Sequence, residues 1–368
     1  MNNFQVVCKM LKLVKPLTLP MLCAIFTGVL GFCCAIGIPV LSSMALLQVT
    51  GMYTHFPLSH IFAILLALAL LRGVLHYIEQ ACNHYIAFKL LAIIRERVYT
   101  ALRRLAPAKL DGRDKGDLIS LITNDVELLE VFYAHTISPV AIAFVMALIL
   151  LKFFAHLHIY AFVIALIAYI VMAIVIPFYV NHKGKDIGQE NRDTIGKLSS
   201  YILESFRGLS TLLQYLSGTK RKNTMLEKGE NIEALQKKMK SIESIQIILS
   251  QWLITISGCV MFVVMFMLYQ QGQVSVYRVI MATVLMISSF GPFIALSNLA
   301  NNLLSTLSSG RRVLSLLEEK ELVAEVKNQP AMTFGDIQIN HVTFAYEDEV
   351  ILDDVNLIFH FHSFQQFL

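Results

Sequence analysis

The stretch Tyr160–Val180, with the sequence YAFVIALIAYIVMAIVIPFYV, contains no charged side chain. As an α-helix it is about 30 Å long, which matches the hydrocarbon core of a bilayer. Five other apolar stretches can cross a bilayer in the same way, at approximately Leu19–Leu47, Ile61–Tyr77, Ile137–Phe154, Ile247–Tyr269 and Val276–Leu296. The sequence therefore predicts an all-α polytopic membrane protein with six long transmembrane helices.

The composition agrees with this class of protein. Hydrophobic residues make up 56% of the chain and charged residues 15%, and the mean hydropathy is +0.63. The net charge of +4 does not indicate nucleic-acid binding, because the basic residues are gathered in connections between apolar stretches. The six cysteines include no C-x-x-C pair and mostly lie in or beside apolar stretches, so no disulfide or metal site is predicted.

The distribution of Lys and Arg predicts the orientation. The N-terminal segment, residues 1–16, carries three lysines. The connection between the second and third stretches carries eight basic residues, and the connection between the fourth and fifth carries twelve. The loop Thr50–His60 on the opposite side has none. Because cytoplasmic loops are enriched in Lys and Arg, we expect a multi-pass protein of the cell membrane with both termini in the cytoplasm.

Two of the connections are predicted to be long helical arms. The segment Ser59–Leu105 has no proline and only one glycine, so it favours a single helix of about 70 Å, of which about 40 Å projects beyond the bilayer core. The segment Asn181–Ile245 predicts two polar helical arms joined near Gly208–Gly218. Such arms are typical of machines that transmit force from a cytoplasmic motor, and they disfavour an ion channel.

The pattern changes after the last span. A charged connector, Arg311–Lys327, is closed by Pro330, and two stretches of alternating polarity follow at Gly335–Tyr346 and Val350–Ile358. Alternation with period two predicts strands. We therefore divide the chain into a cytoplasmic segment (1–16), a membrane domain (17–318), a linker (319–331) and the start of a second, β-containing domain (332–368).

The strand region carries a family resemblance. The six spans, two arms and the sequence IQINHVTFAYEDEVILDDVNL (Ile337–Leu357) resemble ABC exporters in which a type-1 transmembrane domain is fused to a nucleotide-binding domain. The matching strand positions are Val342, Phe344, Tyr346, Leu352, Asp354 and Val355. The resemblance implies that Tyr346 stacks on the adenine of ATP, whereas an isolated strand tyrosine is more often packed in a core.

Both arm tips resemble the coupling segments that dock on the ATPase domains of this family. The first is Pro107–Glu130, with Leu110, Asp111 and Gly112 at its turn. The second is Gly208–Gly218, with Leu212, Leu213 and Gln214 at its centre. The alternative for each is a solvated loop.

The resemblance stops short of the catalytic motifs. The family binds phosphate with G-x-x-x-x-G-K-[ST], followed by a signature loop and an Asp–Glu strand that holds magnesium. None of these motifs occurs in the 368 residues, and the final FHFHSFQQFL resembles nothing in the family. We therefore expect a chain truncated before the phosphate loop, without ATPase activity of its own. ATP and magnesium belong to the complete family member.

A finer resemblance lies in one helix. The segment His76–Tyr99 is similar to one half of the heterodimeric thiol-reductant (cysteine/glutathione) exporters, some relatives of which are labelled amino-acid exporters. In that group the residue matching His84 is associated with haem, and the alternative is an interfacial histidine bonded to a neighbouring helix. Arg72 and Glu79 lie on nearly the same helical face, so they either belong to a substrate cavity or pair with another helix.

Two functions remain open at this point. The first is the transmembrane subunit of an ATP-dependent exporter for a small solute, with a homologous half, an ATPase domain in trans and membrane lipid as partners, and no nucleic acid. The second is a non-transporting remnant or regulatory membrane subunit.

Overall fold

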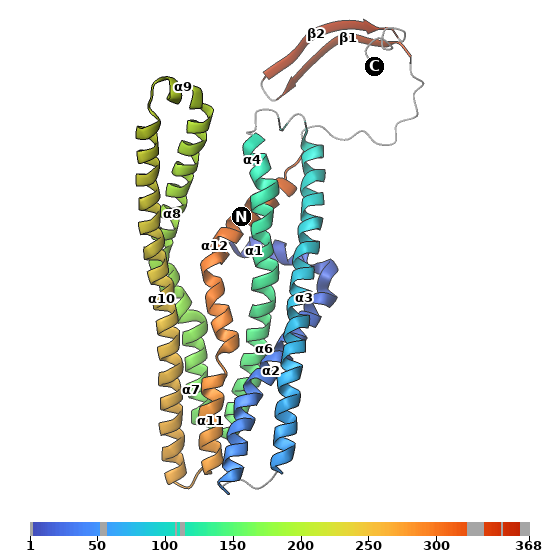
Figure 1. The fold of residues 1–368 in the computed structure, drawn as a ribbon. Coiled ribbons are helices and arrows are strands. Elements are labelled where there is room, and N and C mark those ends of the chain that lie inside the picture. Colours follow the sequence, from blue (N-terminus) through green and yellow to red (C-terminus); the bar gives the residue numbers. More distant parts are fainter. Residues whose placement is uncertain are drawn as a thin grey trace.

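The computed structural model describes residues 3–51, 57–106, 109–110, 115–321, 335–346 and 349–360. The membrane part is helical throughout (Figure 1). Its longer elements are α1 (Asn3–Leu13), α2 (Thr18–Val49), α3 (Leu58–Leu105), α6 (Ser138–Leu157), α7 (Ile159–Ile170), α8 (Ile176–Arg207), α10 (Gly218–Gln270), α11 (Val276–Ser288) and α12 (Gly291–Leu317). Short elements link them: the 3-10 turn η1 (Lys15–Leu17), α4 (Lys115–Ser120), α5 (Val126–Phe132), α9 (Leu209–Gln214) and the π turns η2 (Leu121–Asp125), η3 (Tyr133–Ile137) and η4 (Val171–Val175).

The six predicted spans are confirmed. Within the described residues, six helical segments are long and apolar enough to cross a membrane, at Lys15–Val49, Leu58–Leu105, Leu118–Leu157, Ile159–Gly184, Gly218–Gln270 and Val276–Ser297. The third and fourth spans are not regular α-helices, because they contain the π turns η2, η3 and η4.

The last span differs from the predicted continuous helix. The α-helical pattern is interrupted at Ser289 and Phe290, between α11 and α12. Pro292 has no N–H to donate and fits the first turn of a new helix. α12 continues to Leu317 and so includes the first part of the charged connector. The rest of the predicted linker lies mostly outside the described residues, and the domain boundaries stay predictions.

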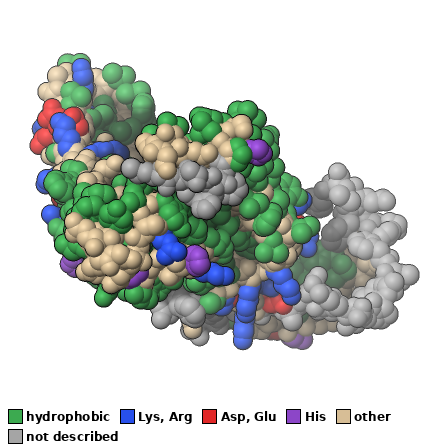
Figure 2. Space-filling model, turned by 90° about the horizontal axis from the view of Figure 1, so that it is seen from below, with side chains coloured by type: hydrophobic (Ala, Val, Ile, Leu, Met, Phe, Trp, Pro, Cys, Tyr) green, Lys and Arg blue, Asp and Glu red, His purple; other side chains and the backbone are tan. Residues whose placement is uncertain are grey.

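The arms are the most prominent feature of the fold. Helix α3 has 48 residues and α10 has 53, so each is a single rod of about 70–80 Å. The tip that joins α8 to α10 through α9 lies at the upper end in Figure 1, together with the end of α3 and the start of α4. The end of α2, the start of α3 and the α10–α11 connection lie at the opposite end. Seen from that end, the surface is mostly apolar or uncharged, with few charged side chains (Figure 2).

Two hydrophobic clusters hold the bundle together. One joins α6, α7, α10 and α11, and Tyr169 is central to it. The Tyr169 hydroxyl donates to Ser289 Oγ at 2.6 Å, and its ring stacks on Phe293 with 4.2 Å between centroids. The other cluster joins α1, α3, α5 and α12, where the buried Tyr133 hydroxyl donates to the carbonyl oxygen of Met10 at 3.2 Å.

The predicted strands are present as an antiparallel hairpin of β1 (Ile337–Tyr346) and β2 (Glu349–Phe359). Ile337 faces Phe359 at one end, and Tyr346 faces Glu349 at the other. Large apolar side chains such as Val350 and Ile358 are 57% exposed. A two-stranded ribbon buries little apolar surface by itself.

Candidate functional site

A cavity of about 310 Å³ lies between α2 and α3. Its walls are formed by Gly28, Gly31, Phe32 and Ala35 of α2 and by Ala69, Arg72, Gly73, His76 and Glu79 of α3. The structure therefore brings the two charged residues singled out in the sequence, Arg72 and Glu79, to one cavity. Whether they bind a substrate there stays a prediction.

A polar stripe runs along the cavity side of α3. Arg72, His76, Glu79 and Asn83 are spaced four, three and four residues apart, so they share one face of the helix. Glu79 is 8% exposed, and its Oε2 lies 3.3 Å from Nδ1 of His76. Asn83 is 2% exposed, and its Oδ1 has no hydrogen-bond partner in the described structure. A carboxylate, an imidazole and a guanidinium on one wall can bind a small solute that carries polar or charged groups.

Sequence reasoning missed His76 and Asn83, although the spacing of the stripe contained the signal. Polar side chains at three- and four-residue intervals within an apolar span mark a face that lines a cavity or a helix contact. Arg72 and Glu79 were recognised because they are charged. His76 and Asn83 were not recognised because a lone His or Asn in a span has many explanations.

The cavity depends on a close helix contact at Gly28. A Cβ atom at this position would overlap Cδ1 of Ile142 on α6 and would lie 3.2 Å from Cδ of Glu79. A larger residue would force the end of the Ile142 side chain to move and would crowd Glu79, so glycine favours the close approach of α2, α3 and α6.

The His84 side chain is exposed and lies beside a second histidine. Its ring is 5.9 Å from that of His135, in an edge-on arrangement, and 6.0 Å from that of Phe88. His135 belongs to the π turn η3, so the sequence did not indicate this neighbour. Imidazole is a common axial ligand of haem iron, and the haem contact expected for His84 stays a prediction. In the described part of the chain, no group of three His, Cys, Asp or Glu residues could hold a metal ion.

The second arm tip carries an exposed helix. α9 has no buried residue, and Leu213 is 66% exposed. Behind it lies an apolar cavity of about 310 Å³. The cavity is lined by Ile202, Ser205, Phe206, Leu209, Leu212, Leu213, Gly218, Arg221, Lys222 and Met225. An exposed apolar helix over an apolar hollow fits a protein partner better than it fits a solvated loop.

The remaining predicted site residues are only partly described. Leu110 is half-buried against the cluster of α1, α3, α5 and α12. Asp111 and Gly112 lie outside the described residues. The backbone of Tyr346 ends β1, but its side chain is also outside the described part, so its predicted contact with adenine stays a prediction.

Comparison with known proteins gives the family. Residues 21–293 match the ABC transporter transmembrane region. The chain belongs to this family. The matched residues include the cavity between α2 and α3 and the α8–α9–α10 arm, so both candidate sites are parts of an ABC exporter's membrane domain. Membrane domains of this kind generally pair with a partner half.

Several curated proteins are similar to this ABC exporter domain. A probable ABC transporter ATP-binding/permease protein of Haemophilus influenzae is 38% identical over 359 residues, which are 97% of this chain and 65% of that protein. The glutathione/L-cysteine transport system ATP-binding/permease protein CydC of the same organism is 22% identical over 218 residues, 59% of this chain and 38% of that protein. An ATP-dependent lipid A-core flippase of Yersinia pestis is 22% identical over 304 residues, 79% of this chain and 50% of that protein. The chain thus spans between about a third and two thirds of these relatives.

Proposed function

We propose that this chain is one membrane half of an exporter that moves a small polar solute out of the cytoplasm by alternating access. It works in a dimer with a homologous half, and ATPase domains drive it at the arm tips. Both termini lie in the cytoplasm, on the side of the arms, because the basic connections gather there.

The observation that carries the proposal is the double role of α3. One unbroken helix contributes Arg72, His76 and Glu79 to the cavity and then continues to Leu105. About 40 Å of rigid helix separates Glu79 from that end. A displacement imposed at the end of the arm therefore moves the cavity wall, which is what coupling between ATP hydrolysis and alternating access requires.

The cavity suggests the kind of solute. It is small, and its wall carries an acid, an imidazole and a guanidinium. These groups favour a compact solute with charged groups over a long acyl chain. The likeness to a glutathione/L-cysteine transport protein makes thiol compounds and amino acids the first solutes to test.

Transport by inside-out membrane vesicles tests the proposal. Vesicles from cells that produce the complete exporter and its partner half should accumulate radiolabelled cysteine or glutathione when ATP is added. They should not accumulate it with ATP and vanadate, which blocks the ATPase cycle. Vesicles that bind ATP but accumulate neither these nor other amino acids would favour a regulatory membrane subunit instead.

A further inference from the structure

The attachment of α9 to its arm poses a physical problem. α9 (Leu209–Gln214) contains no fully buried residue, and Leu212 is only half-buried, so side-chain burial holds it weakly. Its end is closed locally, because the N–H of Ser217 donates to the carbonyl of Leu212 at 3.0 Å. Leu216 has a φ of 51°, a left-handed conformation that costs a leucine about 1–2 kcal/mol. These features shape the turn but do not tie α8 to α10.

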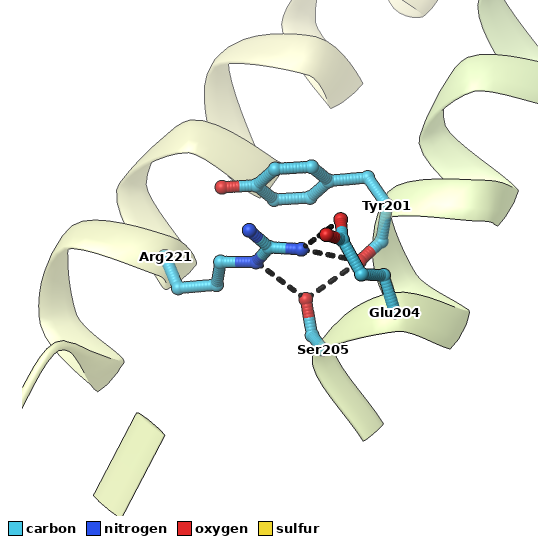
Figure 3. A network of polar contacts seen from close by, with 4 residues as sticks. All are labelled: Tyr201, Glu204, Ser205 and Arg221. Atoms are coloured by element: carbon cyan, nitrogen blue, oxygen red, sulfur yellow. Dashed lines mark hydrogen bonds and ion pairs between the residues drawn. The ribbon is translucent and has the colours of Figure 1, made fainter. Parts of the chain in front are cut away.

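Arg221 adds a polar link close to the tip, between helices that also pack along their length (Figure 3). It lies in the first turn of α10 and reaches across to the last two turns of α8. Its Nε donates to Ser205 Oγ at 2.7 Å, and its Nη2 donates to the carbonyl of Tyr201 at 3.2 Å and to Glu204 Oε2 at 2.6 Å. The guanidinium carbon also lies 3.6 Å from the centroid of the Tyr201 ring. We call this set, Tyr201, Glu204, Ser205 and Arg221, the tip clasp.

The strength of the clasp comes from its geometry more than from its charge. The Glu204 side chain is 72% exposed, so its ion pair with Arg221 contributes little by itself. The Arg221 side chain is only 22% exposed, stacks on an aromatic ring and donates to a buried hydroxyl. Ser205 links Arg221 to the backbone of α8, because its Oγ accepts from Arg221 and donates to the Tyr201 carbonyl at 2.6 Å. A planar fork with several donors can make these contacts together, and a lysine cannot.

We propose that Arg221 is a positioning residue, which fixes α9 on the arm so that a push on α9 reaches the membrane helices. Arg221 also lines the apolar cavity behind α9. The tip clasp therefore adjoins the surface on which we expect a protein partner to dock. A displacement of α9 reaches the membrane only if α9 keeps a fixed orientation relative to α8 and α10. This inference rests on the proposed export function, because it assigns to the clasp the coupling of ATP use to transport.

The first experiment measures the tip itself. In a complete exporter without its native cysteines, nitroxide labels at Leu213→Cys on α9 and Glu190→Cys on α8 report the α9–α8 distance by pulsed electron spin resonance. Arg221→Met should broaden the distance distribution by about twofold or more, because α9 then moves independently of α8. Arg221→Lys should behave like Arg221→Met, since it keeps the charge and loses the fork.

The matched control is Lys220→Met. It removes a positive charge from the neighbouring residue, whose exposed side chain forms no hydrogen bond or ion pair with the described residues. It should leave the distribution unchanged. Ser205→Ala keeps the rest of the clasp and should broaden the distribution by less than Arg221→Met. An unchanged distribution in folded Arg221→Met would overturn the proposal.

The second experiment measures solute transported per ATP hydrolysed. Arg221→Met should lower this ratio by about threefold or more while ATP hydrolysis continues, and Lys220→Met should not change it. A broad distance distribution with an unchanged ratio would show that the clasp has no part in coupling. If the unsubstituted exporter transports none of the tested solutes, the proposed function is wrong. The distance measurement would still test whether Arg221 fixes α9 relative to α8.

Discussion

Oε2 of Glu79 lies 3.3 Å from Nδ1 of His76, one helical turn away on α3, and both side chains line the cavity between α2 and α3. Glu79 is buried, whereas the His76 side chain is 67% exposed. A buried carboxylate whose hydrogen-bond partner is itself exposed on one side is well placed to exchange that partner for a solute.

Replacing Glu79 by Gln should reduce transport about 10- to 100-fold at low solute concentration, because hydrogen bonds to a charged group contribute about 1.5–3 kcal/mol. The measurement is initial uptake by inside-out vesicles. The matched control is Glu96→Gln, which removes an exposed carboxylate from the same helix outside this cavity. Equal uptake by both variants would exclude Glu79 from solute binding.

Replacing Gly28 by Ala should destabilise the membrane domain by about 1–3 kcal/mol, because the added methyl group overlaps Ile142 and crowds Glu79. Thermal unfolding in detergent measures the effect. Gly73→Ala is the matched control, since Gly73 lines the same cavity and a Cβ there would have no heavy atom within 4 Å. Gly28→Ala that unfolds at the temperature of Gly73→Ala would contradict the close helix contact.

The spans and arms could be predicted from sequence for a simple physical reason. A bilayer has a fixed thickness, so apolar length alone indicates a span, and a run such as Ser59–Leu105 without proline indicates one rod. The interruption at Ser289 and Phe290 was signalled by Pro292 but was not predicted. Proline is common enough in spans that its presence does not fix a break.

The side-chain partners could not be predicted, because they depend on which helices meet. His84 and His135 are 51 positions apart in the chain, and Arg221 is 16 from Ser205 across a helical hairpin. No local pattern specifies the rotation of α10 that places Arg221 over Tyr201. Arg72 and Glu79 were predictable together only because they lie on one helix with a spacing of seven.

Haem binding by His84 is a separate proposal. The complete exporter, purified after expression with added haem, should show a Soret band that weakens in His84→Ala. His135→Ala should weaken or shift it as well, because the His135 ring lies beside that of His84, with 5.9 Å between the ring centroids. His60→Ala, another exposed histidine outside this pair, is the control. A colourless preparation would leave His84 as an interfacial residue.

The orientation can be tested by labelling single cysteines in intact cells. In a background without the six native cysteines, Ser59→Cys at the start of α3 should react with a membrane-impermeant maleimide added outside. Gly218→Cys at the start of α10 should react only after the cells are opened, because it lies on the basic arm. External labelling of Gly218→Cys in sealed cells would contradict the predicted orientation. The arm tips would then lie outside the cell, where ATPase domains could not dock on them.

The left-handed residue at the arm tip gives the last prediction. Leu216 is 90% exposed and has a φ of 51°, so its side chain gains no burial in return for its strained backbone. Leu216→Gly should remove this strain and stabilise the α9–α10 turn by up to about 1 kcal/mol. Hydrogen exchange of the Ser217 amide, which donates to the Leu212 carbonyl, should then slow by up to about fivefold. Leu213→Gly, on the regular part of α9, should speed that exchange, because glycine is unfavourable inside a helix. If Leu216→Gly speeds exchange instead, the strain at Leu216 does not limit the stability of the turn, and the prediction is wrong.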